Sequence, residues 1–180
     1  MYYGLQLQLL LYLDAYLEKH PDQEVGGVFY FHINNPYVSY KAGMGDEEIA
    51  ETGLKQFKLS GLALDDLEVI EALDKSKTGS TIPVSINKDG SIKKGSSVAT
   101  KAQFKQLENH ILNIIRELGK EILEGKVSIK PYELNGKNPC EYCIYHTICQ
   151  FNEEMPDNCY EQLHKISKET VWEELEKEGN

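Results

Sequence analysis

The sequence of 180 residues lacks the long hydrophobic run that a membrane helix needs. No apolar stretch reaches the ~18 residues that span a bilayer. The apolar N-terminus has neither a basic leader segment nor a small-residue cleavage site. We therefore expect no membrane segment and no secretory signal, and we predict a cytoplasmic protein. HExxH, P-loop and GxGxxG motifs are also missing, which leaves the enzyme classes that carry them without support.

Positive charge is scarce as well. Lys and Arg number 19 against 29 Asp and Glu, which gives a formal net charge of -10. This argues against DNA binding over the whole surface, because affinity for phosphates depends on Lys and Arg. Lysines nevertheless gather between positions 88 and 105, and they are candidate contacts for a DNA backbone: Lys88, Lys93, Lys94, Lys101 and Lys105. A solvated charged surface is the alternative interpretation.

Cysteine is rare, but three of the four cysteines lie within ten positions, in NPCEYCIYHTICQF. Cys140, Cys143 and Cys149 form a C-x2-C-x5-C pattern. A cytoplasmic protein keeps its thiols reduced, so disulfides are not expected. Thiolates at this spacing bind zinc or iron–sulfur clusters.

Such a site takes four ligands, and the run supplies three. His146 lies inside the run, where the geometry is tight, and Cys159 follows after nine intervening residues. We expect five apolar neighbours to enclose the sulfurs: Tyr142, Ile144, Tyr145, Ile148 and Phe151. That shell favours an iron–sulfur cluster shielded from solvent. Zinc held by all four cysteines is the alternative.

The N-terminal half of the chain reads as helices around a strand. Residues 2–19 predict a helix that is apolar nearly all round and therefore buried. Residues 24–33 predict a strand covered on both faces. Residues 46–75 predict short helices, broken at Gly53 and Gly61. A helix followed by a buried strand indicates an α/β fold.

The C-terminal half contains the clearest helix, over residues 101–124. Thr100 is its expected N-cap, with Gln103 at the capping-box position, and Gly125 follows its last turn. A β-hairpin is predicted before it, over residues 82–92, and a final amphipathic helix over residues 169–177.

Gln8 and Tyr12 interrupt the leucine-rich surface of the first helix. They are four positions apart, so they share one face of it. The amide and the hydroxyl could contact a phosphate or fix a catalytic side chain. The alternative is a satisfied pair in the core.

Four stretches together resemble a known family: GLQLQLLLYLDAYL, FKLSGLALDD, GSSVATKAQFKQLENHI and PCEYCIYHTICQF. They are similar to the C-terminal end of the AddB subunit of bacterial AddAB-type ATP-dependent helicase–nucleases, from Gly4 to Tyr160. The resemblance implies an α/β fold. It would be part of a restriction-endonuclease-like PD-(D/E)xK nuclease domain, helix-rich and with a C-terminal cysteine-stapled segment.

The resemblance also assigns roles to residues. Cys140, Cys143 and Cys149 would be three ligands of a 4Fe-4S cluster, with the fourth cysteine far upstream. Gln8 and Tyr12 would be the Q-x3-Y motif, which supports the active site and DNA contact. The carboxylates that bind Mg2+ and the lysine beside them would precede that motif. We therefore expect them upstream of this chain, which would be a C-terminal fragment.

The implied function belongs to a larger subunit that processes DNA double-strand breaks for recombinational repair, with DNA and an AddA-type subunit as partners. We expect residues 1–135 to complete the nuclease domain, residues 136–160 to hold the cluster, and residues 161–180 to form a helical tail. The fragment alone would be inactive. The alternative function is a free-standing, zinc-stapled binding module with a four-cysteine site.

Overall fold

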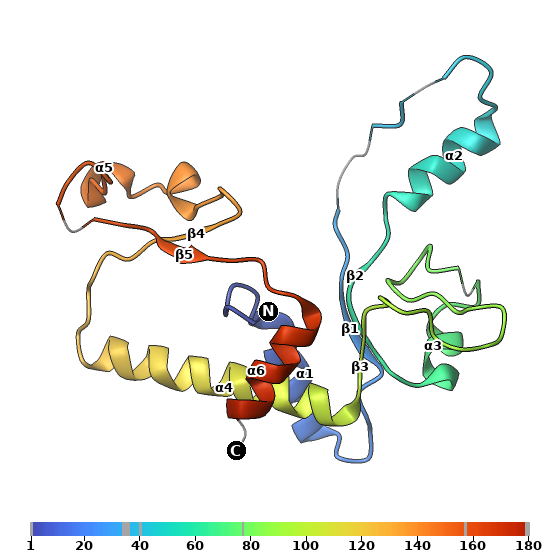
Figure 1. Ribbon diagram of the computed structural model, residues 1–180, viewed down its shortest axis with the longest axis horizontal. Coiled ribbons are helices and arrows are strands. Elements are labelled where there is room, and N and C mark those ends of the chain that lie inside the picture. The colour runs from blue at the N-terminus through green and yellow to red at the C-terminus, as the bar shows by residue number, and fades with distance from the viewer. Residues whose placement is uncertain (1, 34–36, 40, 77, 157, 179–180) are drawn as a thin grey trace. The chain divides into compact units, whose positions relative to one another are not determined.

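The computed structural model describes residues 2–33, 37–39, 41–76, 78–156 and 158–178 (Figure 1). The chain divides into two compact units. Residues 7–108 form one, which we call the central unit. Residues 1–6 and 109–180 form the other, the terminal unit. These bounds reflect contacts, whereas the boundaries expected at 135 and 160 concern function.

The central unit is built on a three-stranded sheet of order β1-β2-β3. Its strands are β1 (Gly27–Tyr30), β2 (Ser60–Leu64) and β3 (Val98–Ala99). β1 and β2 are antiparallel, and β2 and β3 are parallel. Its helices are α1 (Gln8–Lys19), α2 (Asp46–Lys55) and α3 (Leu67–Leu73), and α4 (Lys101–Leu123) begins in it. The fold is therefore mixed α/β, as expected.

The core of the central unit lies between β2, α3 and the segment that leads to β3. Ala63, Ile70, Ile82 and Val84 form one buried cluster. Gly61 lets the strands come together, because a Cβ there would lie 2.0 Å from the carbonyl oxygen of Val28.

Two predictions for the N-terminal half were wrong in their burial. α1 begins at Gln8, and of its residues only Leu10 is buried. β1 has four residues, and only Val28 among them is buried. Both predictions rested on apolar residues all round the segment, which require a partner on every side. The described residues form three short strands here, and such a sheet covers one face of a helix.

The helices predicted over residues 46–75 are present as α2 and α3, but the break at Gly53 and the absence of a strand were wrong. α2 runs through Gly53 without a break, and β2 occupies Ser60–Leu64. The apolar run in SGLAL pairs with β1 on one side and β3 on the other. Pairing with distant strands therefore decides this segment over its local pattern.

The predictions for the C-terminal half were closer. α4 covers Lys101–Leu123, and its N-terminus has the expected capping box. The Thr100 hydroxyl accepts from the Gln103 N–H at 3.2 Å, and the Thr100 N–H donates to the Gln103 side chain at 2.9 Å. The hairpin is present as a bridge between Ile86 and Ile92. The final helix, α6, spans Lys168–Glu178.

The terminal unit contains the rest of α4 and several short elements. They are β4 (Tyr132–Leu134), the 3-10 helix η1 (Pro139–Tyr142), α5 (His146–Cys149), β5 (Glu161–Leu163) and α6. β4 and β5 pair in parallel. Of the helices that the described residues form, none is long and apolar enough to cross a membrane.

His110 joins the two ends of the terminal unit to α4. Its ring stacks on Tyr2 at a 6° interplanar angle. Nε2 lies 2.8 Å from the carbonyl oxygen of Tyr2, and Nδ1 lies 2.6 Å from a carboxylate oxygen of Glu178. Both partners are acceptors, so the ring donates to both only in its doubly protonated form.

Candidate functional site

The cysteine segment consists of two short helical turns with a link between them. Cys140 lies in η1, which begins at Pro139, and Cys143 follows it in extended backbone. Cys149 is the last residue of α5, where Gln150 adopts a left-handed conformation and ends the turn. The Cys143 N–H donates to the Cys140 carbonyl at 3.3 Å. This folding places three thiols on adjacent turns.

All four cysteines are free thiols. Cys140 and Cys149 are half-buried, and Cys143 and Cys159 are exposed. Cysteine thiolates are the ligands that zinc and iron–sulfur clusters prefer, so the residue type fits such a group. No group of three or more His, Cys, Asp or Glu in the described part of the chain is arranged to hold a metal ion. The donor chemistry therefore fits such a group, and the described residues do not close a complete ligand set around it.

The expected apolar shell around the cysteines was wrong for four of its five members. Tyr142, Ile144, Tyr145 and Ile148 are 62–87% exposed, and only Phe151 is buried. Turns of four residues have a single inward side, so most side chains on them point to solvent. Phe151 instead packs on Tyr160, with ring centroids 4.9 Å apart.

Tyr160 directly precedes β5 and contacts the cysteine segment at Cys140 and Phe151. Burial, followed by a hydrogen bond to the Cys140 side chain and the charge on that sulfur, raises the pKa of Tyr160 to about 12. The stretch that carries Cys159 therefore returns to Cys140. Sequence reasoning missed Tyr160, and no local pattern identifies it, because the β4–β5 pairing brings the two segments together.

Gln8 and Tyr12 lie side by side at the start of α1, as predicted. Gln8 Nε2 donates to the Tyr12 hydroxyl at 2.6 Å. Both residues are exposed, and Tyr12 is 63% exposed. The alternative of a pair buried in the core was wrong. This hydrogen bond uses a Gln8 N–H and a Tyr12 lone pair. The Gln8 side-chain oxygen can therefore still accept, and the Tyr12 hydroxyl can still donate, to a ligand at this face of α1.

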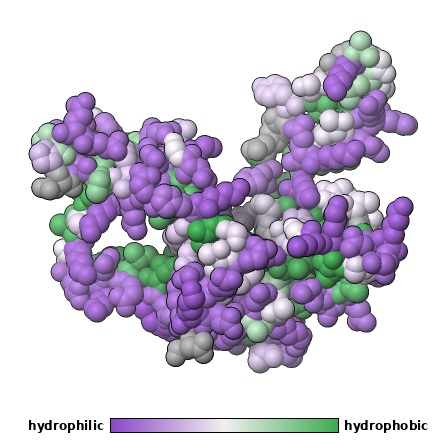
Figure 2. Space-filling model, in the orientation of Figure 1, coloured by the Kyte–Doolittle hydropathy of each residue, from purple (hydrophilic) through white to green (hydrophobic). Residues whose placement is uncertain are grey.

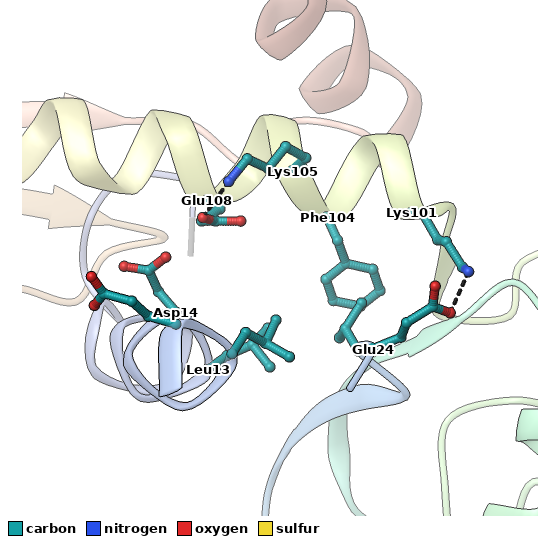
Figure 3. A pocket seen from close by; sticks show the side chains of 10 residues that line it. Leu13, Asp14, Glu24, Lys101, Phe104, Lys105 and Glu108 are labelled. Atoms are coloured by element: carbon teal, nitrogen blue, oxygen red, sulfur yellow. Dashed lines mark hydrogen bonds and ion pairs between the residues drawn. The ribbon is translucent and has the colours of Figure 1, made fainter. Parts of the chain in front are cut away.

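The five lysines do not form one free basic surface. Lys101 pairs with Glu24, and Lys105 pairs with Glu108 at 2.6 Å (Figure 3). These two line a cavity of about 570 Å³ that also has four carboxylates in its wall, from Asp14, Glu18, Glu24 and Glu108. An acidic wall repels phosphate. Lys88, Lys93 and Lys94 are exposed on the hairpin.

Comparison with known proteins gives the family. The model of the PD-(D/E)XK nuclease superfamily matches residues 1–150. The chain is 41% identical over its whole length to the B-type subunit of an ATP-dependent helicase/deoxyribonuclease from Thermoanaerobacter sp. (strain X514), and covers 16% of that protein. Proteins with the same description from Acetivibrio thermocellus and Clostridium botulinum (strain Loch Maree) are 38% and 40% identical over 96% and 98% of the chain. The chain again covers 16% of each.

The family match spans most of the chain and agrees with its mixed α/β fold. The protein belongs to the PD-(D/E)XK nuclease superfamily. The resemblance to AddB-type subunits is confirmed across the full chain. A free-standing binding module does not account for this similarity.

Proposed function

We propose that this chain forms part of the nuclease domain of an ATP-dependent helicase/deoxyribonuclease subunit that processes DNA double-strand breaks in the cytoplasm for recombinational repair. The observation that carries the proposal is the exposed, hydrogen-bonded Gln8–Tyr12 pair on α1 in a chain of this superfamily. DNA and an AddA-type subunit are the proposed partners of the whole protein.

In this proposal Gln8 and Tyr12 act as positioning residues. Their hydrogen bond fixes both side chains with little further loss of rotamer freedom. The Tyr12 hydroxyl then donates to a DNA phosphate, and the Gln8 side-chain oxygen accepts from a neighbouring catalytic group. Mg2+ in the whole nuclease would lower the pKa of its bound water and supply the attacking hydroxide. The carboxylates and lysine that serve it would come from residues outside this chain.

The test uses the whole subunit in complex with its helicase partner. Tyr12→Phe removes the hydroxyl and keeps the ring, so we expect DNA cleavage to fall on the order of tenfold or more, with unwinding retained. Tyr16→Phe is the matched control, because Tyr16 is exposed on the same helix and bonds Gln23 instead. Equal cleavage by both variants would contradict the proposed role.

The second part of the test concerns the 180 residues alone. We expect no DNA cleavage with Mg2+, since in this proposal residues 1–135 would supply only part of a nuclease domain and not its catalytic carboxylates. Metal-dependent cutting by this chain would show that its own carboxylates are sufficient.

We further propose that residues 136–160 hold a 4Fe-4S cluster through Cys140, Cys143 and Cys149, with a fourth ligand from outside or Cys159 in its place. Four free thiols, three of them on adjacent turns, support this. Anaerobically purified protein should contain iron and sulfide in equal amounts. Cys159→Ser tests which ligands hold the metal. Stoichiometric zinc without iron in the parent protein, together with loss of that zinc in the variant, would favour the four-cysteine zinc site.

The exposed lysines of the hairpin, Lys88, Lys93 and Lys94, are proposed as a secondary DNA contact. Lys101 and Lys105 contribute less in this proposal, since each is ion-paired beside an acidic cavity.

Residues 161–180, which include α6, form the C-terminal tail.

A further inference from the structure

Two cavities in the terminal unit share a wall. Their volumes are about 570 Å³ and about 490 Å³, and Leu5, Tyr132, Leu134 and Asn135 line both. The two cavities therefore adjoin at these four residues, and we treat them as one groove between the N-terminal segment and β4. We call it the tyrosine groove, because four tyrosines line it: Tyr2, Tyr3, Tyr132 and Tyr142.

The charge of the tyrosine groove is opposite to that of the protein. The described residues that line it include Lys137 and Lys165 and no carboxylate. Neither lysine has an ion pair with another residue that the structure describes. Three other cavities each have three or more carboxylates in their walls. In a chain of net charge -10, the groove is thus a local site for an anion.

A tight turn places one of these lysines at the groove. Asn135 and Gly136 both have positive φ, at 54° and 72°. Leu134 and Lys137 exchange backbone hydrogen bonds of 2.9 and 3.1 Å across them. Asn-Gly with two positive φ angles is the signature of a type I′ turn. The turn therefore returns Lys137 to the side of Leu134, on the groove wall.

Two of the tyrosines are held rigidly. Tyr2 stacks on His110, and Tyr3 meets Tyr2 edge-on at 5.2 Å. The Tyr3 hydroxyl donates to the His164 carbonyl at 2.6 Å. Burial, with the charges of Glu178 and Glu174, raises the pKa of Tyr2, so its hydroxyl stays neutral. Fixed aromatic rings bind a flat ligand with little loss of rotamer entropy.

Tyr142 offers the opposite arrangement at the far end of the groove. Its ring is 87% exposed and forms no ring contact or hydrogen bond with any described residue. Gln6 and Asn135 add amide groups along the wall. Aromatic faces, unpaired lysines and amides are the set that binds unpaired nucleotides: bases stack, phosphates meet lysines, and amides reach base edges.

We propose that the tyrosine groove binds a short segment of single-stranded DNA. This rests on the proposed function for its choice of DNA as the ligand, and it requires neither a metal nor cleavage. Tyr142 stacks on a base, and Lys137 and Lys165 contact phosphates. The groove thereby gives the strand a path along the terminal unit, distinct from the lysines of the hairpin.

The experiment measures fluorescence anisotropy of a labelled 12-mer of thymidine with the 180-residue chain, in EDTA and at several salt concentrations. Tyr142→Leu should weaken binding about tenfold, through the loss of one stacked base. Lys137→Gln with Lys165→Gln should also weaken binding, and it should reduce the slope of log affinity against log salt by about 1.4, for two phosphates on a single strand.

The controls match each change in type. Tyr145→Leu alters an exposed tyrosine of the same segment that does not line the groove. Lys58→Gln with Lys120→Gln removes the same charge from exposed sites elsewhere. Both should leave affinity within about twofold. Far-UV circular dichroism confirms that each variant is folded, and Tyr142, being exposed, can change without loss of packing.

Several outcomes would overturn the inference. Equal weakening by the control lysines would mean unspecific charge attraction. Tighter binding of the matching RNA would assign the groove to ribose-containing strands. Loss of binding only on Lys88→Gln, Lys93→Gln and Lys94→Gln together would place the contact on the hairpin. Failure of the proposed nuclease role would appear separately, as unchanged cleavage by Tyr12→Phe in the whole subunit.

Discussion

The two compact units differ in how much apolar surface they bury. Ten of the thirteen buried hydrophobic residues in the described chain belong to the central unit, and three belong to the terminal unit. The three are Ile111, Phe151 and Leu175. Burial is the main favourable term in folding, so the central unit has the means to hold itself together. The terminal unit has fewer buried apolar side chains to stabilise it.

The surface of the terminal unit shows the same difference. The α4 residues Leu118, Ile122 and Leu123 are exposed, and Figure 2 shows an apolar stretch along this half of the helix. Small units with few buried residues commonly depend on metals or partners for their order. This agrees with the proposal of a cluster at the cysteines. The difference in stability between the two units can be tested with the substitutions below.

The largest effect should come from the core of the central unit. Ile70→Ala removes a side chain that is 1% exposed and packs in the main cluster. Loss of transfer energy and the remaining cavity should lower the free energy of unfolding by about 3 kcal/mol. Urea titration measures it. Leu54→Ala, on an exposed position of α2, should change stability by less than about 0.5 kcal/mol.

A smaller effect is expected at the His110 contact of the terminal unit. His110→Phe keeps a ring against Tyr2 but loses both hydrogen bonds, which leaves two acceptors without their donor. We expect the free energy of local unfolding to fall by about 1–3 kcal/mol. Faster amide hydrogen exchange should appear in α6 and in the second half of α4 only. Faster exchange in β1 and β2 as well would mean that the two units unfold together.

The capping box at the start of α4 should contribute less. Thr100→Ala removes the acceptor for the Gln103 N–H, and the expected loss is about 1 kcal/mol. Thr100→Ser keeps the hydroxyl and should restore most of it. Thermal melting of the three proteins compares them, and an alanine variant as stable as the serine variant would contradict the contribution of the cap.

The smallest effect should be a pH dependence at the hairpin turn. Hydrogen bonds from the Ser91 side chain and backbone lower the pKa of Asp89 from its ordinary value of 3.8. A lowered pKa in the folded state gives stability that is present above 3.8 and lost as pH falls through the lower folded value. Asp89→Asn should therefore be slightly less stable than the parent at pH 7.

The comparison at low pH completes that test. The difference between Asp89→Asn and the parent should vanish in urea titrations at pH 2, where the carboxyl is protonated. A difference that persists unchanged would mean that shape, rather than charge, matters at this turn.

Local signals predicted α4 well. The Thr100–Gln103 capping box, the apolar stripe and Gly125 all act within a few residues, and the helix follows them. The Gln8–Tyr12 hydrogen bond was predictable for the same reason, since residues four apart on a helix always face the same side. The failures came where a segment depends on a distant partner. β2 was missed because the residues that pair with it lie 30 or more positions away on either side.

The sequence by itself determined the ends of α4, the C-x2-C-x5-C spacing and the family, because these follow from neighbouring residues and from similarity along the chain. Only the tertiary structure decided which apolar residues are buried, how Tyr160 meets Cys140, and where Tyr2, Lys137 and Tyr142 come together in one groove. These arrangements join residues twenty or more positions apart or depend on how much surface a small sheet can cover. A local pattern contains neither kind of information.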